Sequence, residues 1–101
     1  MSQSRCIALV VDYDAQAAEA LRQRIETLGC ITVSVTDPRQ ALAVALLVQP
    51  RIAFVDRTMH EVEPSLRRHF GEDALKVVIF DGERSTLDRD ALSRLLSPFL
   101  G

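Results

Sequence analysis

The chain has 101 residues, 48% hydrophobic and 26% charged, a composition typical of one globular domain and not of a disordered or low-complexity segment. Its formal net charge is only −2, with 12 Lys and Arg residues interleaved among 14 Asp and Glu residues, so no basic stripe indicates nucleic-acid binding. The longest nearly apolar run, 41–48, is far shorter than the ~20 residues that cross a bilayer, and no secretory signal pattern begins the chain. We therefore expect one cytoplasmic domain over residues 1–101.

The first predicted unit is a strand, a helix and a second strand. Residues 6–11 form an apolar run rich in β-branched residues, as in a parallel strand covered on both faces. Apolar residues then recur at helical spacing over 15–28, with Asp14 as the expected N-cap. Residues 31–35 alternate between apolar and polar, which predicts a half-exposed edge strand.

A second helix is predicted between two prolines. Asp37 provides an N-cap and Pro38 stands at the first helical position. The helix should end before Pro50. Its expected buried stripe is Ala41, Leu42, Ala45 and Leu46.

The rest of the chain predicts two more strands and two more helices. Strands are expected at 52–55 and 77–80, a short helix at 64–70 and a last amphipathic helix at 86–96. Strands and helices that alternate with short connections are typical of a right-handed, helix-covered parallel sheet.

The two cysteines lie inside apolar, strand-like segments. Cys6 and Cys30 lack CxxC or histidine spacing, so we interpret both as small buried hydrophobes, with a disulfide or a redox role as the alternative.

Three acidic residues follow predicted strands directly. Asp12, Asp56 and Asp81 each come at the carboxyl end of an apolar strand. In a parallel α/β sheet these ends share one edge, where the functional crevice lies. A single such residue is often only a turn or cap residue, but three together predict an acidic pocket.

These residues carry a resemblance to the receiver domain of bacterial response regulators. The resemblance runs from about residue 6 to 99 and rests on the segments 10–14, 54–59 and 97–99. It implies a flavodoxin-like, three-layer α/β fold with a parallel sheet of four or five strands in the order 2-1-3-4(-5). Asp56 falls on the phosphoacceptor position of that family.

Three of the five positions on which phosphotransfer in receivers depends are changed. Asp56 and Asp12 match the pattern, but Tyr13 replaces a carboxylate that ligates Mg²⁺, and a phenol is a poor ligand for this hard cation. Asp81 stands where a switch Ser or Thr is expected, and Ser97 where a Lys is expected.

The changed positions weaken the chemistry that the family uses. Phosphoryl transfer to a carboxylate needs cations that offset the charge of the phosphoryl oxygens. Tyr13 weakens the metal site, Ser97 removes the lysine cation, and Asp81 adds a negative charge. We therefore expect a receiver that acts without phosphorylation and without a cofactor, with Mg²⁺ binding weak if it occurs. A receiver phosphorylated on Asp56 remains an alternative.

The C-terminal region is shorter than in receivers, which continue through a further helix, strand and helix. Two layouts fit the sequence: a vestigial fifth strand ending at 97–99, or a four-stranded sheet whose last helix replaces the deleted elements. We favour the second. It leaves the strand 77–80 at an edge, and an apolar edge invites pairing with another chain.

Two other functions fit parts of the sequence. Asp12-Tyr13-Asp14 resembles the DxD motif of haloacid-dehalogenase-type phosphatases, but Gln16 replaces the usual Thr or Val and further motifs are absent. Arginines near the carboxyl end of the sheet, foremost Arg57 and Arg84, could bind an anionic messenger such as a cyclic dinucleotide.

The sequence thus predicts a pseudo-receiver and not an enzyme. We expect a protein interaction or regulatory module of bacterial two-component or phosphorelay signalling. Its partner would be a kinase or a regulator, or a second copy bound through the 77–80 strand or the face of the last helix.

Overall fold

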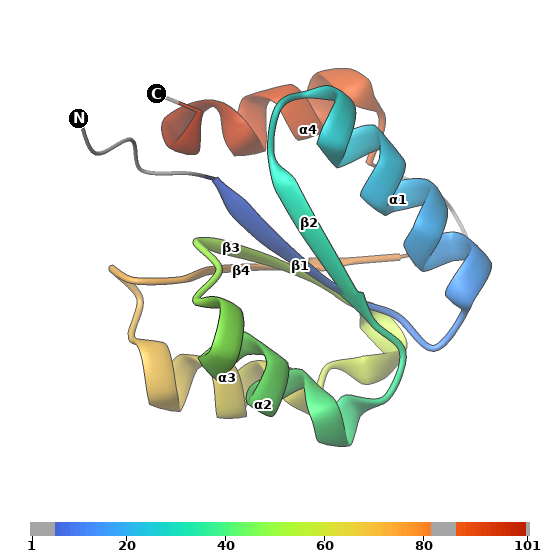
Figure 1. Cartoon of the computed structure of the whole chain (residues 1–101). Helices are drawn as coiled ribbons and strands as arrows, with labels where there is room; N and C mark the ends of the chain where they lie inside the picture. Colours follow the sequence, from blue (N-terminus) through green and yellow to red (C-terminus); the bar gives the residue numbers. More distant parts are fainter. Residues whose placement is uncertain (1–5, 82–86, 101) are drawn as a thin grey trace.

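The computed structural model describes residues 6–81 and 87–100, which form three layers with a parallel sheet in the middle (Figure 1). The sheet has four strands in the order β2-β1-β3-β4, as the sequence predicts. The strands are β1 (Ile7–Val11), β2 (Ile31–Val35), β3 (Ile52–Asp56) and β4 (Lys76–Phe80).

Two layers of helices cover the sheet, one on each face (Figure 1). The helices α1 (Ala15–Thr27) and α4 (Arg89–Leu96) contribute to one hydrophobic cluster. The helices α2 (Pro38–Val48) and α3 (Val62–Phe70) contribute to the other. Two short 3₁₀ helices, η1 (Arg57–Met59) and η2 (Ser97–Phe99), follow β3 and α4.

Side-chain caps fix where three of the helices begin. The carboxylates of Asp14 and Asp37 accept bonds from backbone N–H groups in the first turns of α1 and α2, as the sequence predicts. Asp88 caps α4 in the same way through the N–H of Ala91. The last helix therefore begins at residue 89 and not at 86, because Asp88 holds the extended backbone of an N-cap.

The two central strands, β1 and β3, are almost completely buried. Every residue of β3 is buried, as are four of the five residues of β1. Both strands place side chains alternately in the two clusters, so Val10 and Phe54 face α1 and α4 while Leu9 and Val55 face α2 and α3. This burial on both faces explains why their sequences are continuous apolar runs.

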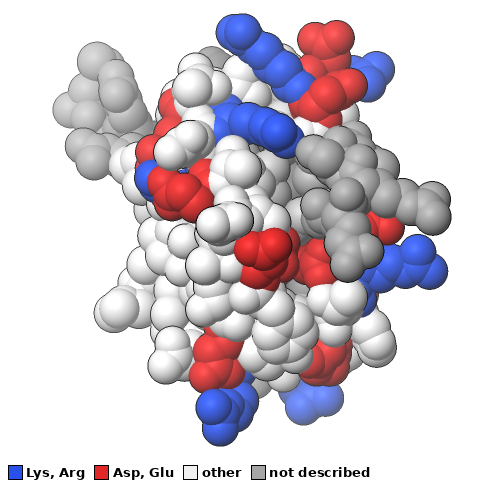
Figure 2. All heavy atoms as spheres, turned by 90° about the vertical axis from the view of Figure 1, so that its right-hand side faces the viewer, with Lys and Arg blue, Asp and Glu red and all other residues white. Residues whose placement is uncertain are grey.

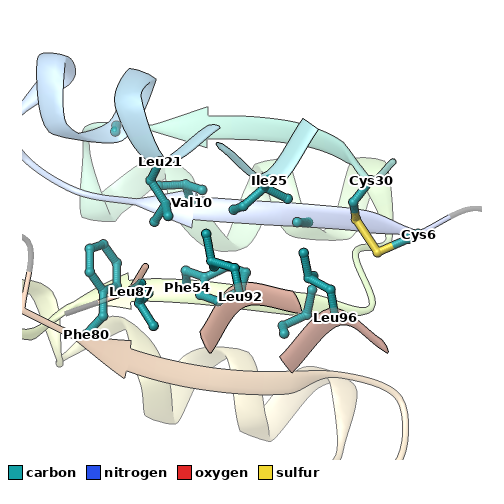
Figure 3. Packing of buried hydrophobic residues seen from close by; sticks show 13 residues of the cluster. Cys6, Val10, Leu21, Ile25, Cys30, Phe54, Phe80, Leu87, Leu92 and Leu96 are labelled. Atoms are coloured by element: carbon teal, nitrogen blue, oxygen red, sulfur yellow. A yellow bond between two sulfur atoms is a disulfide. The ribbon is translucent and has the colours of Figure 1, made fainter. Parts of the chain in front are cut away.

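After β4, a helix occupies the place next to α1, and the described residues contain no fifth strand. Leu87, Leu92 and Leu96 are buried in the cluster that α1 also contributes to (Figure 3). This finding confirms the four-strand layout. It also leaves β4 at an edge of the sheet, with Ile79 38% exposed.

The cysteines form a disulfide, which corrects our interpretation of them as free, buried hydrophobes (Figure 3). Cys6 and Cys30 are 24 residues apart in sequence, and their Cα atoms are 4.8 Å apart. The reason is register: β1 pairs with β2 so that Ile7 lies opposite Ile31, and each cysteine comes one residue earlier. Both are nonetheless buried, as predicted.

The predicted stripe of α2 was partly wrong. Ala41 and Ala45 are fully buried, but Leu46 is 46% exposed and Leu47 is 83% exposed. Small alanines let the helix lie close to the sheet, so the flanking leucines point away from it. Helix α3 also begins two residues before its predicted start, because Pro64 is tolerated in a first turn.

No helix in the ranges 6–81 and 87–100 has the length and apolar character that crossing a membrane requires.

Candidate functional site

A polar pocket of about 310 Å³ opens at the carboxyl ends of the strands. Figure 2 views the molecule from this end, and red acidic residues lie near the middle of the face. The pocket is lined by Asp12, Tyr13, Asp14, Ala17, Asp56, Arg57, Thr58 and Asp81. The structure thus brings together the three acidic residues that follow β1, β3 and β4.

Asp12 is the most constrained of these acids. It is 4% exposed, and its Oδ1 accepts a bond from the N–H of Asp14 at 3.0 Å. Its Oδ2 is buried and has no hydrogen-bond partner. Burial raises the pKa of the Asp12 carboxyl above its ordinary value; the bond from Asp14 opposes the rise, and the charges of Asp56 and Asp14 add to it.

Asp56 ends β3 and is 6% exposed. Its Oδ2 accepts bonds from the backbone N–H of Thr58, at 3.1 Å, and from the Thr58 hydroxyl. These bonds cap η1. The Asp56 carboxylate is therefore bonded within its own turn, which holds one of its oxygens in a fixed orientation.

Tyr13 lies at the mouth of the pocket and does not seal it. Its side chain is 54% exposed, and its hydroxyl is 3.5 Å from Oε1 of Glu61, just before α3. The hydroxyl reaches toward the residue that precedes α3, because Asp12 is buried and the next residue along the chain points to the other side.

The remaining candidates divide between the pocket and the rest of the chain. Asp81 and Arg57 line the pocket, and Arg57 is exposed. Arg84 lies outside the described residues.

Ser97 lies at the opposite end of the sheet from the pocket. It begins η2, directly after Leu96, whose side chain lies beside the disulfide at the amino ends of β1 and β2 (Figure 3). Two residues later, the Phe99 ring is 5.8 Å from the guanidinium carbon of Arg51, which precedes β3. The last helix leads toward the amino ends of the strands, so Pro98 and Phe99 line a different cavity, together with Arg51 and Lys76.

The residues present do not fit a typical magnesium site. Within 6–81 and 87–100, no three His, Cys, Asp or Glu side chains are grouped so that they could hold a metal ion. Tyr13 supplies no carboxylate, and its hydroxyl lies near Glu61. The Oδ2 of Asp12 has no hydrogen-bond partner among the described residues, but less than 1 Å² of this atom is exposed.

Sequence reasoning missed Thr58 and Glu61. Thr58 holds Asp56, and a Thr two residues after an Asp is the signal that could have found it, since such a hydroxyl often bonds within a turn. Glu61 is 48 residues from Tyr13 in sequence, and no local pattern predicts their approach.

Comparison with known proteins supports the fold. No family model matches the chain, and no curated protein does. The structure is similar to that of a response regulator receiver protein from Burkholderia phymatum, with a TM-score of 0.74 and 18% sequence identity over 96% of each chain. The chain therefore has the receiver fold of response regulators.

Proposed function

We propose that the protein is a pseudo-receiver: a receiver-fold module that binds a partner protein in bacterial signalling without being switched by phosphorylation. The observation that carries the proposal is the described lining of the pocket, in which residues 6–81 contribute four carboxyl groups and one guanidinium group around the space where a phosphoryl group would sit. The receiver-like neighbour supports a role in signalling.

The electrostatics of the pocket argue against a bound phosphoryl group. A phosphoryl group on Asp56 would place at least one more negative charge among Asp12, Asp14 and Asp81. Such charge needs cations close by. Arg57 is the one Lys or Arg residue among the described lining of this pocket, and Ser97 is at the far end of the sheet.

The same argument disfavours an anionic messenger at this pocket. A cyclic dinucleotide carries two phosphates, and each would meet more carboxylates than guanidinium groups. The alternative is tested by calorimetric titration with cyclic dinucleotides, for which we expect no heat of binding.

Phosphorylation itself is tested with acetyl phosphate or beryllofluoride plus Mg²⁺, followed by NMR of the ¹⁵N-labelled chain. We expect no more than small shifts near Asp56, and none in α4. Large shifts that spread from Asp56 to α4 would contradict the proposal and indicate a standard receiver. Hydrolysis of p-nitrophenyl phosphate that is lost in Asp12→Asn would indicate a phosphatase instead.

Two kinds of partner fit the proposal. One is a kinase or a regulator, and the other is a second copy of the chain, bound through the edge strand β4. The outer side of α4 is less suited to an apolar dimer contact, because its exposed residues are charged or small and polar: Arg89, Asp90, Ser93 and Arg94. A strictly monomeric mass by light scattering at high protein concentration would rule out self-association.

A further inference from the structure

The outer side of α2 carries a patch of apolar side chains. Leu47 is 83% exposed, the largest exposed fraction among the large apolar side chains of residues 6–81 and 87–100, and Leu46 is 46% exposed. Ala43 is exposed as well and stands three and four residues before them, which makes the three side chains neighbours on the helix surface. Isolated exposed leucines are ordinary, but adjoining ones indicate an interaction surface.

The core of the domain does not account for these leucines. A surface helix normally turns its large apolar side chains inward and its polar ones outward. In α2 the two fully buried residues are the alanines Ala41 and Ala45, while Leu46 and Leu47 belong to neither hydrophobic cluster. The patch is therefore left for a contact beyond the described part of the chain.

The patch also lacks charged residues, which favours a second copy of the chain as its occupant. From Gln40 to Gln49 the helix contains no Asp, Glu, Lys or Arg. A two-fold contact lays a surface on its own copy, so a charge near the axis meets a like charge there. A partner with charged residues in the contact would find no counter-charge on this stretch of α2. An uncharged centre is thus what a symmetric pair of α2 helices requires.

A hollow beside the helix offers a place for a side chain of the second copy. It has a volume of about 420 Å³, lies between α2 and α3, and is lined by Pro38, Arg39, Leu42, Glu61, Val62 and Ser65. Leu46 stands one turn beyond Leu42 on the same side of α2, but it is not among the residues that line the hollow.

An antiparallel pair of α2 helices that crosses at Ala43 brings Leu46 to this hollow. Residues 40 and 46 are both three positions from Ala43, about 4.5 Å along the axis, so Leu46 of one copy lies level with residue 40 of the other. That level falls between Arg39 and Leu42, which line the hollow. A small residue at the crossing point lets the two helices approach closely. The face of α2 thus has both a projecting side chain and a cavity that receives it.

We propose that two copies of the chain associate through α2, packed antiparallel about a two-fold axis at Ala43, with Leu46 of each copy in the hollow of the other. The contact uses none of the described residues that line the acidic pocket, and it is distinct from pairing through the edge strand β4. The inference goes beyond the proposed function, which holds for one copy as well as for two. A monomeric chain would therefore leave the phosphorylation test unaffected, so the two proposals fail separately.

Sedimentation equilibrium of the chain, from micromolar to millimolar concentration, tests whether the copies associate. We expect a reversible monomer–dimer equilibrium with a Kd on the order of 100 µM, because a contact of one helix from each copy is small for a protein interface. A monomeric mass up to millimolar concentration would overturn the proposal. Assembly beyond the dimer would also overturn it, since a two-fold contact between identical patches closes on itself.

Charged substitutions locate the contact. Leu47→Glu buries an unpaired charge in an uncharged contact and should weaken the dimer at least about tenfold, while Ser93→Glu, which adds the same charge to the exposed side of α4, should change the Kd by less than about twofold. Equal losses in the two variants would reduce the effect to net charge and overturn the site. A dimer that is lost in Ile79→Glu and kept in Leu47→Glu would place the contact at β4 instead. Should Leu47→Glu fail to fold, Leu46→Glu is the second variant, with the same expectation.

Cross-linking tests the antiparallel geometry, because the two native cysteines are already paired with each other. Residue 43 meets its own copy at the axis, so Ala43→Cys should form a disulfide between the copies under mild oxidation. In Gln40→Cys the two new thiols would be about 9 Å apart along the axis, beyond the range of a disulfide. We expect Ala43→Cys to cross-link about tenfold faster than Gln40→Cys. Equal rates would overturn the crossing at Ala43.

Discussion

The two ends of the sheet are built in opposite ways. At the amino ends, Cys6 and Cys30 are bonded to each other, Leu96 packs beside them, and Phe99 lies against Arg51. At the carboxyl ends the same strands stop at carboxyl groups around an open pocket. The comparison shows covalent and apolar contacts at one end of the sheet and a cluster of acidic side chains at the other.

The largest expected effect comes from comparing two leucines of the hydrophobic cluster to which α1 and α4 contribute, one near each end of the sheet. Leu96 is fully buried near the disulfide, and Leu87 is 9% exposed near Phe80 at the other end of the cluster (Figure 3). Leu96→Ala should lower the free energy of unfolding by about 3 to 4 kcal/mol, and Leu87→Ala by about 2 kcal/mol, because a deeply packed site leaves the larger cavity. Urea denaturation measures both. A greater loss for Leu87→Ala would reverse the comparison.

Removal of the disulfide should come next. The bond closes a loop over a sequence separation of 24 residues, for which the chain-entropy model gives about 3.5 kcal/mol. Reduction should lower the free energy of unfolding by that amount, which urea denaturation with and without reductant measures.

The control for this prediction is the variant Cys6→Ala/Cys30→Ala, which should respond to reductant no further. A reductant effect of the same size in that variant would show that the loss does not come from the bond.

At the carboxyl end a substitution should stabilise the protein. Asp12→Asn keeps the oxygen that accepts the Asp14 N–H and removes a buried charge, so we expect a gain of about 1 kcal/mol at neutral pH. Because the pKa of Asp12 is raised on folding, its ionisation costs stability above that pKa. The gain should therefore vanish as the pH falls to the ordinary value of 3.8 and below.

The measurement is denaturant unfolding of both proteins from neutral to acidic pH, with Asp90→Asn as the control for net charge. A gain in stability that persists at acidic pH, or a loss of stability at neutral pH, would contradict the conclusion that the ionised Asp12 carboxylate destabilises the folded protein.

The smallest effect concerns the contact of Arg51 with Phe99. The guanidinium carbon lies 5.8 Å from the ring centroid, and an exposed pair of this kind contributes about 0.5 kcal/mol. Arg51→Met keeps an apolar stem over the ring and should lower the melting temperature slightly. Arg68→Met, an exposed change on α3, should lower it less; an equal change would assign no stabilising role to the ring contact.

The sequence allowed the strand order, the four-strand layout and two helix caps to be predicted, because these depend on local periodicity and on Asp or Pro at helix starts. It also allowed the meeting of Asp12, Asp56 and Asp81 to be predicted, since parallel strands end at one edge. It did not reveal the disulfide, the Tyr13 contact with Glu61 or the place of Ser97. Each of these depends on how segments distant in sequence align in space.

The alignment of β1 and β2 has a further consequence for how the chain reaches its native structure. A slip that keeps the same side chains facing the core must move a strand by two residues, about 6.6 Å. Such a slip would carry the sulfur atoms beyond bonding range, whereas Ile7 opposite Ile31 brings them together. The disulfide can therefore form only when β1 and β2 are paired in the native register, and its formation fixes that register covalently.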